Sequence, residues 1–176
     1  LNPITYGILG IRNFQGKSNL LLNFKATGDN AKAFISSMDG NGILYSKSNR
    51  MHGLDISAMF RNLPGAFKPQ SMARQTTEMD NLNANFTLNN GVLENNDLSV
   101  NSRFLQFTGK GKIDFANSKI DYTFVPQRVF RLDKTAGMGN RISYPLTVKG
   151  PLKAPTISPN LQRPLKNNPS LKPTFA

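Results

Sequence analysis

The sequence of 176 residues contains no cysteine, no tryptophan and a single histidine. Without cysteine the chain can form neither a disulfide nor a thiolate metal site. Its cysteine content therefore fits an oxidising and a reducing compartment equally well. Its apolar residues occur in short clusters and nowhere approach the roughly 20 consecutive apolar residues of a membrane-spanning helix. The chain begins at Leu1 with no basic-then-apolar leader, and we expect it to be a piece of a longer protein whose targeting segment is missing.

Residues for catalysis or metal binding are sparse. The histidine, His52, stands between Met51 and Gly53 with no nucleophile or carboxylate signature beside it, although catalysis needs an oriented base, a nucleophile and oxyanion donors together. The ten acidic residues are scattered, and none has the spacing of a calcium loop or a zinc site. We therefore predict no catalytic residue, no metal site and no cofactor, and we rank an enzyme last among the possible functions.

One glycine-rich stretch, Gly109-Lys110-Gly111-Lys112, invites comparison with a phosphate-binding loop. A Walker loop ends in Gly-Lys-Ser/Thr and opens a helix, whereas here a strand pattern continues on both sides. We interpret the two glycines as residues that let a strand bend and the two lysines as side chains that point outward.

The net charge of +12 is unevenly distributed, because residues 103 to 176 contain 13 Lys/Arg and 3 acids. Such a field attracts nucleic acid, anionic phospholipid headgroups and lipopolysaccharide phosphates alike. Single-stranded nucleic acid would need aromatic rings beside the basic face. Phe107 and Tyr122 instead fall on the apolar side of their predicted strands, and lysines such as Lys110 and Lys119 fall on the opposite side. We expect an anionic membrane surface, contacted through the basic C-terminal half, and no nucleic acid.

Alternating apolar and polar residues dominate the chain. This alternation predicts strands over residues 17 to 27, 43 to 45, 81 to 88, 92 to 124 and 142 to 148, and the sheet is expected to end near Ile157. Asn89-Asn90-Gly91 and Ala116-Asn117-Ser118 are predicted turns. The parity of the apolar residues changes between Val100 and Leu105, so a bulge or bend is expected near Ser102-Arg103.

Two short helices interrupt the strands. Apolar residues recur at helical spacing from Asn30 to Met38, where Asn30 is the predicted N-cap, and from Asp55 to Leu63, where Pro64 follows. Helices of this length are expected to lie over one face of the sheet. Residues 64 to 80 have no clear period and are predicted to form a loop, and residues 127 to 141 a basic connection.

The predicted fold class is therefore mainly β: a curved antiparallel sheet, an open groove-like β-meander with two short connector helices. Residues 1–158 are expected to form one domain. Residues 159–176 carry four prolines and three basic residues, and cannot bury enough apolar surface to offset the entropy lost on ordering. We expect this tail to be disordered.

Seven apolar residues on neighbouring predicted strands are the candidate site. A single sheet can hide them only beneath the helices or beneath a ligand, so they are the residues expected to line an apolar groove. They are Leu105, Phe107, Ile113, Phe115, Ile120, Tyr122 and Phe124.

Several segments resemble the C-terminal region of AsmA-like proteins (the AsmA/TamB-type envelope proteins). They are Asp39 to Gly42, Gly53 to Ile56 with the helix after it, Leu98 to Asp114, Pro145 to Gly150, and Pro155 to Pro159. The resemblance covers roughly residues 17 to 160, while residues 64 to 80 and the tail follow no pattern of that family. It implies a periplasmic protein, anchored in the inner membrane of a Gram-negative bacterium by a segment absent here.

The family resemblance also implies a function. Repeated strands would form a long groove with an apolar interior that binds or conducts phospholipid between the inner and outer membranes, and this module would be its terminal part. The alternative is a scaffold or assembly factor for outer-membrane protein biogenesis, with envelope proteins as partners and with the apolar face simply packed as core. The family carries no catalytic residues over to this chain.

Overall fold

The computed structural model describes residues 14–52, 55–60, 76–102, 105–129 and 144–162. The predicted loop at 64–75, most of the predicted basic connection and the tail from residue 163 lie outside these ranges. The division into a domain and a disordered tail therefore stays a prediction.

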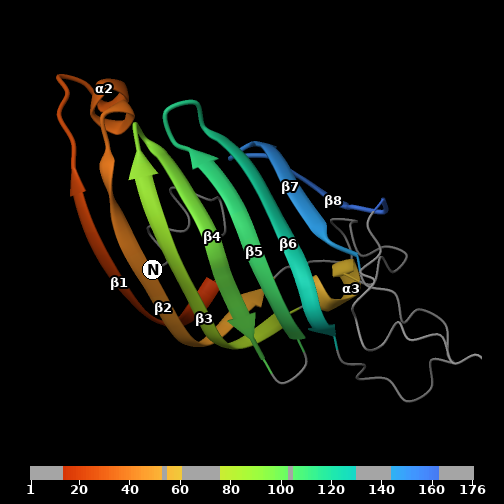
Figure 1. Ribbon diagram of the computed structural model, residues 1–176. Helices are drawn as coiled ribbons and strands as arrows, with labels where there is room; N and C mark the ends of the chain where they lie inside the picture. The colour runs from red at the N-terminus through yellow and green to blue at the C-terminus, as the bar shows by residue number, and fades with distance from the viewer. Residues whose placement is uncertain (1–13, 53–54, 61–75, 103–104, 130–143, 163–176) are drawn as a thin grey trace, which may run out of the picture.

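Eight strands form one open antiparallel sheet in which every strand pairs with its neighbours in the sequence (Figure 1). The strands are β1 (Phe14–Lys25), β2 (Asp39–His52), β3 (Thr76–Asn89), β4 (Val92–Asn101), β5 (Leu105–Asp114), β6 (Lys119–Val129), β7 (Leu146–Pro151) and β8 (Thr156–Pro159). β1 and β8 are the two edges, and the sheet does not close into a barrel. The expectation of a mainly β, open meander is confirmed.

The turns at one end of the sheet are joined by main-chain hydrogen bonds. Asn90 and Gly91 have positive φ angles of 50° and 75°, as a tight two-residue hairpin turn requires. The Gly91 N–H donates to the Met38 carbonyl at 2.9 Å, and the Phe115 N–H donates to the Gly91 carbonyl at 3.1 Å. Both predicted turns are confirmed, and this end of the sheet forms a continuous rim.

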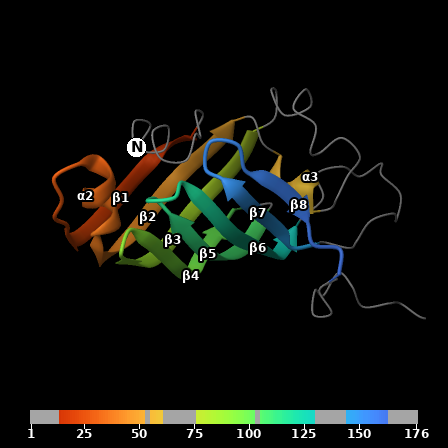
Figure 2. The ribbon, with the colours of Figure 1, turned by 90° about the horizontal axis from the view of Figure 1, so that it is seen from above.

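The two helices within the described ranges lie at opposite ends of the sheet (Figure 2). α2 (Ala31–Ser36) follows β1, and the Asn30 side chain caps it by accepting a hydrogen bond from the Ala33 N–H at 2.9 Å, as predicted. α3 is described over Ile56–Phe60. Residues 61–63, the rest of the predicted helix, lie outside the described ranges. α3 places Met59 and Phe60 in the hydrophobic core, so it does cover the sheet.

Several strand boundaries differ from the prediction. The strand expected over residues 43 to 45 is β2, which runs from Asp39 to His52, and the strand expected over residues 17 to 27 is β1, which runs from Phe14 to Lys25. Residues 76–80 are not loop but the start of β3, since their backbone pairs with the end of β2. Residues 127–129 continue β6 by pairing with β5, and β7 begins only at Leu146. The longer strands are extended by pairing with a neighbouring strand, where the local sequence pattern is weak.

The paired strands have irregular register at four places, between Gln15 and Lys17, between Asn83 and Phe86, between Asn95 and Leu98, and between Gln106 and Phe107. Of the bulge or bend expected near Ser102-Arg103, the structure has a bend at Ser102, which lies between the end of β4 and the start of β5. Val100 pairs directly with Phe107. The reversal of the chain between the two strands thus accounts for the change of parity, and no bulge is needed at Ser102.

Candidate functional site

One face of the sheet carries most of its apolar side chains. Residues paired across antiparallel strands point to the same face, so the register defines rows of side chains. One row crosses all eight strands through Leu22, Gly42, Phe86, Asn95, Gly111, Tyr122, Val148 and Ile157. We call this side the apolar face, and the opposite side the polar face.

The α3 end of the apolar face is closed by packing. Phe60 is fully buried, and its ring centroid lies 5.4 Å from that of Phe107. The Phe107 ring in turn meets the Phe124 ring edge-on, with 5.8 Å between their centroids. Met59, Met79, Val100, Leu105 and Leu146 complete this cluster. This part of the face is a hydrophobic core.

The structure divides the seven predicted groove residues among different surroundings. Leu105, Phe107 and Phe124 meet in the core beneath α3. Ile113 pairs with Ile120 at the other end of β5 and β6, and both are half-buried. Phe115 lies just beyond β5, half-buried, and Tyr122 is buried in a polar network.

The more open part of the apolar face lies on β1. Leu20, Leu22 and Phe24 point to this face and are 40%, 41% and 43% exposed. The alternation of residues 17 to 27 did predict a half-buried strand, yet these residues were not among the expected groove residues. The signal that identifies them is their register with Leu44 and Phe86 through β2, which the sequence alone does not give.

A polar network interrupts the apolar face at its centre. The Tyr122 hydroxyl donates to the Asn95 Oδ1, and the Asn95 Nδ2 donates to the Asp97 Oδ1 at 2.8 Å. Asp97 also accepts the Asn85 N–H at 2.9 Å and the Asn85 side-chain amide at 2.5 Å. This network bridges the irregular pairings of β3 with β4 and of β4 with β5.

The network shifts two pKa values. Burial, and then the nearby Asp97 charge, raise the pKa of Tyr122 well above its usual range, so the phenol stays protonated and can donate. Burial alone would raise the pKa of Asp97, but the hydrogen bonds from Asn85 and Asn95 outweigh it and hold that pKa below its usual value. These groups are bonded to one another, so we interpret the network as structural.

The polar face carries cross-strand ion pairs. Arg50 pairs with Glu78 at 3.2 Å. Glu94, Lys112, Asp121 and Lys149 form a row of alternating charge, with Lys112 to Glu94 at 3.2 Å and Lys149 to Asp121 at 3.1 Å. Lys110 and Lys119 are exposed. Opposite charges on neighbouring strands favour this register over a slipped one.

The two glycines of the Gly109-Lys110-Gly111-Lys112 stretch lie on the apolar face. Gly109 pairs with Phe124 and Gly111 with Tyr122. A Cβ on Gly109 would come within 2.8 Å of the Tyr122 ring. The glycines therefore make room for aromatic rings, and the outward lysines of the prediction are found as exposed side chains.

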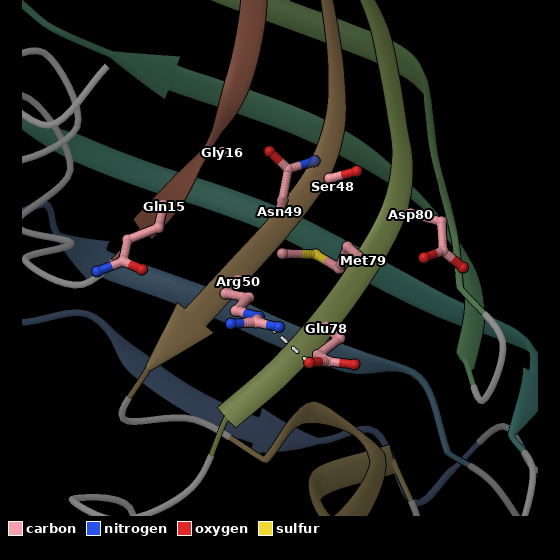
Figure 3. A pocket seen from close by; sticks show the side chains of 8 residues that line it. All are labelled: Gln15, Gly16, Ser48, Asn49, Arg50, Glu78, Met79 and Asp80. Carbon is pink, nitrogen blue, oxygen red and sulfur yellow. Dashed lines mark ion pairs between the residues drawn. The ribbon is translucent and has the colours of Figure 1, made fainter.

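A pocket of about 400 Å³ lies at the ends of β1, β2 and β3 nearest α3 (Figure 3). Its lining is mostly polar and includes Gln15, Arg50, Glu78 and Asp80. The Asn49 Nδ2 is buried there without a partner. Rotating the amide would let that nitrogen donate to the Ser46 hydroxyl, which then donates to the Lys17 carbonyl at 3.0 Å. Such a polar pocket does not suit an acyl chain.

Other candidate chemistry is limited. His52 shares a hydrogen bond of 2.9 Å with the Thr76 hydroxyl. Within the described ranges, no three His, Cys, Asp or Glu side chains gather as metal ligands would. Nor does any helix among those residues have the length and apolar character needed to cross a membrane.

Comparison with known proteins gives one similarity. No protein-family model and no solved structure matches the chain. Over 113 residues it is 26% identical to Protein AsmA of Escherichia coli (strain K12). This match covers 62% of this chain and 18% of that protein. The chain thus spans less than a fifth of that curated relative. The chain is similar to AsmA, in agreement with the AsmA-like resemblance of its sequence, and its expected place in the C-terminal region of such proteins stays a prediction.

Proposed function

We propose that this chain is a non-catalytic module of the bacterial cell envelope, the terminal part of a periplasmic β-groove that binds or conducts phospholipid between the inner and outer membranes. The observation that carries the proposal is the partly exposed stretch of the apolar face at Leu20, Leu22 and Phe24. The likeness to AsmA supports an envelope protein. The alternating apolar face, opposite a charged one, supports a surface that takes up acyl chains.

The energetics favour an acyl chain on this surface. Each methylene buried against an apolar surface contributes about 0.8 kcal/mol, so about ten buried methylenes would contribute about 8 kcal/mol toward binding. The apolar face continues across β2 and β3 through Leu44 and Phe86, which leaves a path for a chain to extend along the sheet. The affinity of such contacts should change little with salt, unlike that of exposed charges.

The test uses two adjacent leucines of β1 that point to opposite faces. A photo-crosslinking amino acid replaces Leu22 on the apolar face or Leu21 on the polar face, and cross-linked phospholipid is identified by mass spectrometry after irradiation in the bacterial envelope. We expect several-fold more phospholipid at Leu22. Leu21 is the more exposed of the two, so accessibility alone would give the opposite result.

The alternative function, a scaffold for outer-membrane protein assembly, gives a different outcome. The packed cluster around Phe60 and Phe107 favours it, because there the apolar face is core. In that case neither leucine should capture phospholipid, and cross-linked protein should appear instead. Equal capture of lipid at Leu21 and Leu22 would also contradict a groove.

A further inference from the structure

Three rows of side chains cross the apolar face from the partly exposed stretch of β1. They begin at Leu20, Leu22 and Phe24, and each continues through the direct pairing of β1 with β2 and of β2 with β3. An acyl chain that binds at β1 can extend into the sheet only along a row that stays apolar and open. What each row meets on β4 therefore decides where such a chain can lie.

Two of the three rows offer no path past β4. The row from Leu22 meets Asn95, which is buried and hydrogen-bonded to Tyr122 within the polar network. The row from Leu20 runs toward Leu98, which packs against the core cluster beneath α3. A hydrocarbon chain cannot replace the hydrogen bonds of the network, and a close-packed core leaves no room for one.

The third row stays apolar past β4. It lies next to the rim of joined turns, on the far side of the polar network from α3, and we call it the rim row. Its members, paired directly from β1 to β6, are Phe24, Gly40, Leu88, Leu93, Ile113 and Ile120. Leu88 is buried, whereas Leu93, Ile113 and Ile120 are half-buried. Among the described residues, these three belong neither to the core cluster nor to the side chains packed against it.

The spacing of the strands matches the length of an acyl chain. Neighbouring strands lie about 4.8 Å apart, so the three steps from Phe24 on β1 to Leu93 on β4 span about 14 Å. One leaflet is half of a hydrocarbon core about 30 Å thick, which gives an acyl chain a reach of about 15 Å. A chain that lies across the strands from Phe24 therefore reaches Leu93 without leaving the rim row.

We propose that one acyl chain of a phospholipid lies across β1 to β4 along the rim row, and that it contacts Leu93 at β4. This inference rests on the proposed function, because it places the lipid of the proposed groove. The polar network then separates a lipid-binding side of the apolar face from a structural side beneath α3. Leu105, Phe107 and Phe124, three of the residues expected to line the groove, lie on the structural side.

Leu93 and Leu98 form a matched pair for the test. Both are half-buried leucines of β4 that point to the apolar face, and they lie on opposite sides of Asn95. A photo-crosslinking amino acid replaces either residue in the full chain, and the same replacement at Leu22 serves as the reference for lipid binding. After irradiation in the bacterial envelope, mass spectrometry should find several-fold more cross-linked phospholipid at Leu93 than at Leu98.

Alanine substitutions at the same two positions separate lipid binding from stability. Leu93→Ala should lower several-fold the amount of phospholipid that co-purifies with the folded chain. Leu98→Ala should leave that amount unchanged, yet lower the unfolding temperature more than Leu93→Ala does, because Leu98 packs against the core. Loss of phospholipid in Leu98→Ala but not in Leu93→Ala would place the acyl chain on the wrong side of the network and overturn the proposal.

The cross-linking results also distinguish this proposal from the proposed function. Capture of phospholipid at Leu22 without capture at Leu93, or equal capture at Leu93 and Leu98, would overturn the rim row as the path and leave a lipid-binding surface at β1 intact. Absence of phospholipid at all three positions would contradict the proposed function, and this inference with it.

Discussion

Asp97 shows how a single exposed carboxylate can fix an irregular part of a sheet. It accepts hydrogen bonds from the backbone and side chain of Asn85 and from the side chain of Asn95, where the pairing of β3 with β4 is irregular. Replacing it removes the acceptor of both Asn85 donors, while the Asn95 Nδ2 still donates to the Asn85 carbonyl at 2.6 Å. Hydrogen bonds to a charged group at an exposed position give an expected loss of about 1 to 2 kcal/mol for Asp97→Ala.

The pH dependence of that loss follows from the lowered pKa of Asp97. Because the folded-state pKa lies below the unfolded value of 3.8, the stabilisation is present above 3.8 and disappears as the pH falls through the folded-state pKa. Urea unfolding should show a difference between Asp97→Ala and the parent chain at neutral pH that shrinks below pH 3.8. An unchanged difference at low pH would contradict this account.

Gly109 gives a second prediction at the scale of one residue. A side chain there would collide with Leu98, Tyr122 and Phe124 on the apolar face. We expect Gly109→Val to lower the free energy of unfolding by about 1 to 3 kcal/mol through overpacking. The neighbouring exposed position provides the control, since Thr108→Val should change it by less than about 0.5 kcal/mol. Equal effects at both positions would mean that the rings do not occupy this space.

At the scale of elements, the two short helices differ in what they contribute. α3 buries Phe60 completely in the core, whereas Phe34 of α2 is 41% exposed. Phe60→Ala should therefore cost about 3 to 5 kcal/mol of stability through the cavity it leaves. Phe34→Ala, the same substitution, should cost far less. Urea titration of both variants checks this, and a small loss for Phe60→Ala would mean that α3 does not close the apolar face.

At the scale of the whole molecule, the sheet itself is nearly neutral. The described ranges hold 11 of the 22 Lys/Arg and 9 of the 10 acids, so most of the charge of +12 belongs to the remaining residues. The expected contact with an anionic membrane thus depends on the basic residues of those segments. These basic residues are not confined to the C-terminal half of the chain. The tail alone supplies Arg163, Lys166 and Lys172.

Removing residues 163–176 tests the tail. Thermal unfolding of the shortened chain should match that of the full chain, because a tail that is expected to be disordered adds little stability. Affinity for vesicles containing phosphatidylglycerol should fall about fivefold per lost basic residue, as expected for about 1 kcal/mol each. A large loss of thermal stability would show that the tail docks on the sheet.

The sequence by itself determined the class of fold, because alternation with period two, turn residues such as Asn90 and Gly91, and the cap at Asn30 act within a few residues of chain. It also placed the lysines on the opposite side of the strands from the apolar residues. The tertiary structure alone decided which apolar residues are core and which are open. Phe107 and Leu22 have similar local patterns, but α3 packs on Phe107 and no described element buries Leu22. That difference arises from the packing of distant elements, which local pattern does not encode.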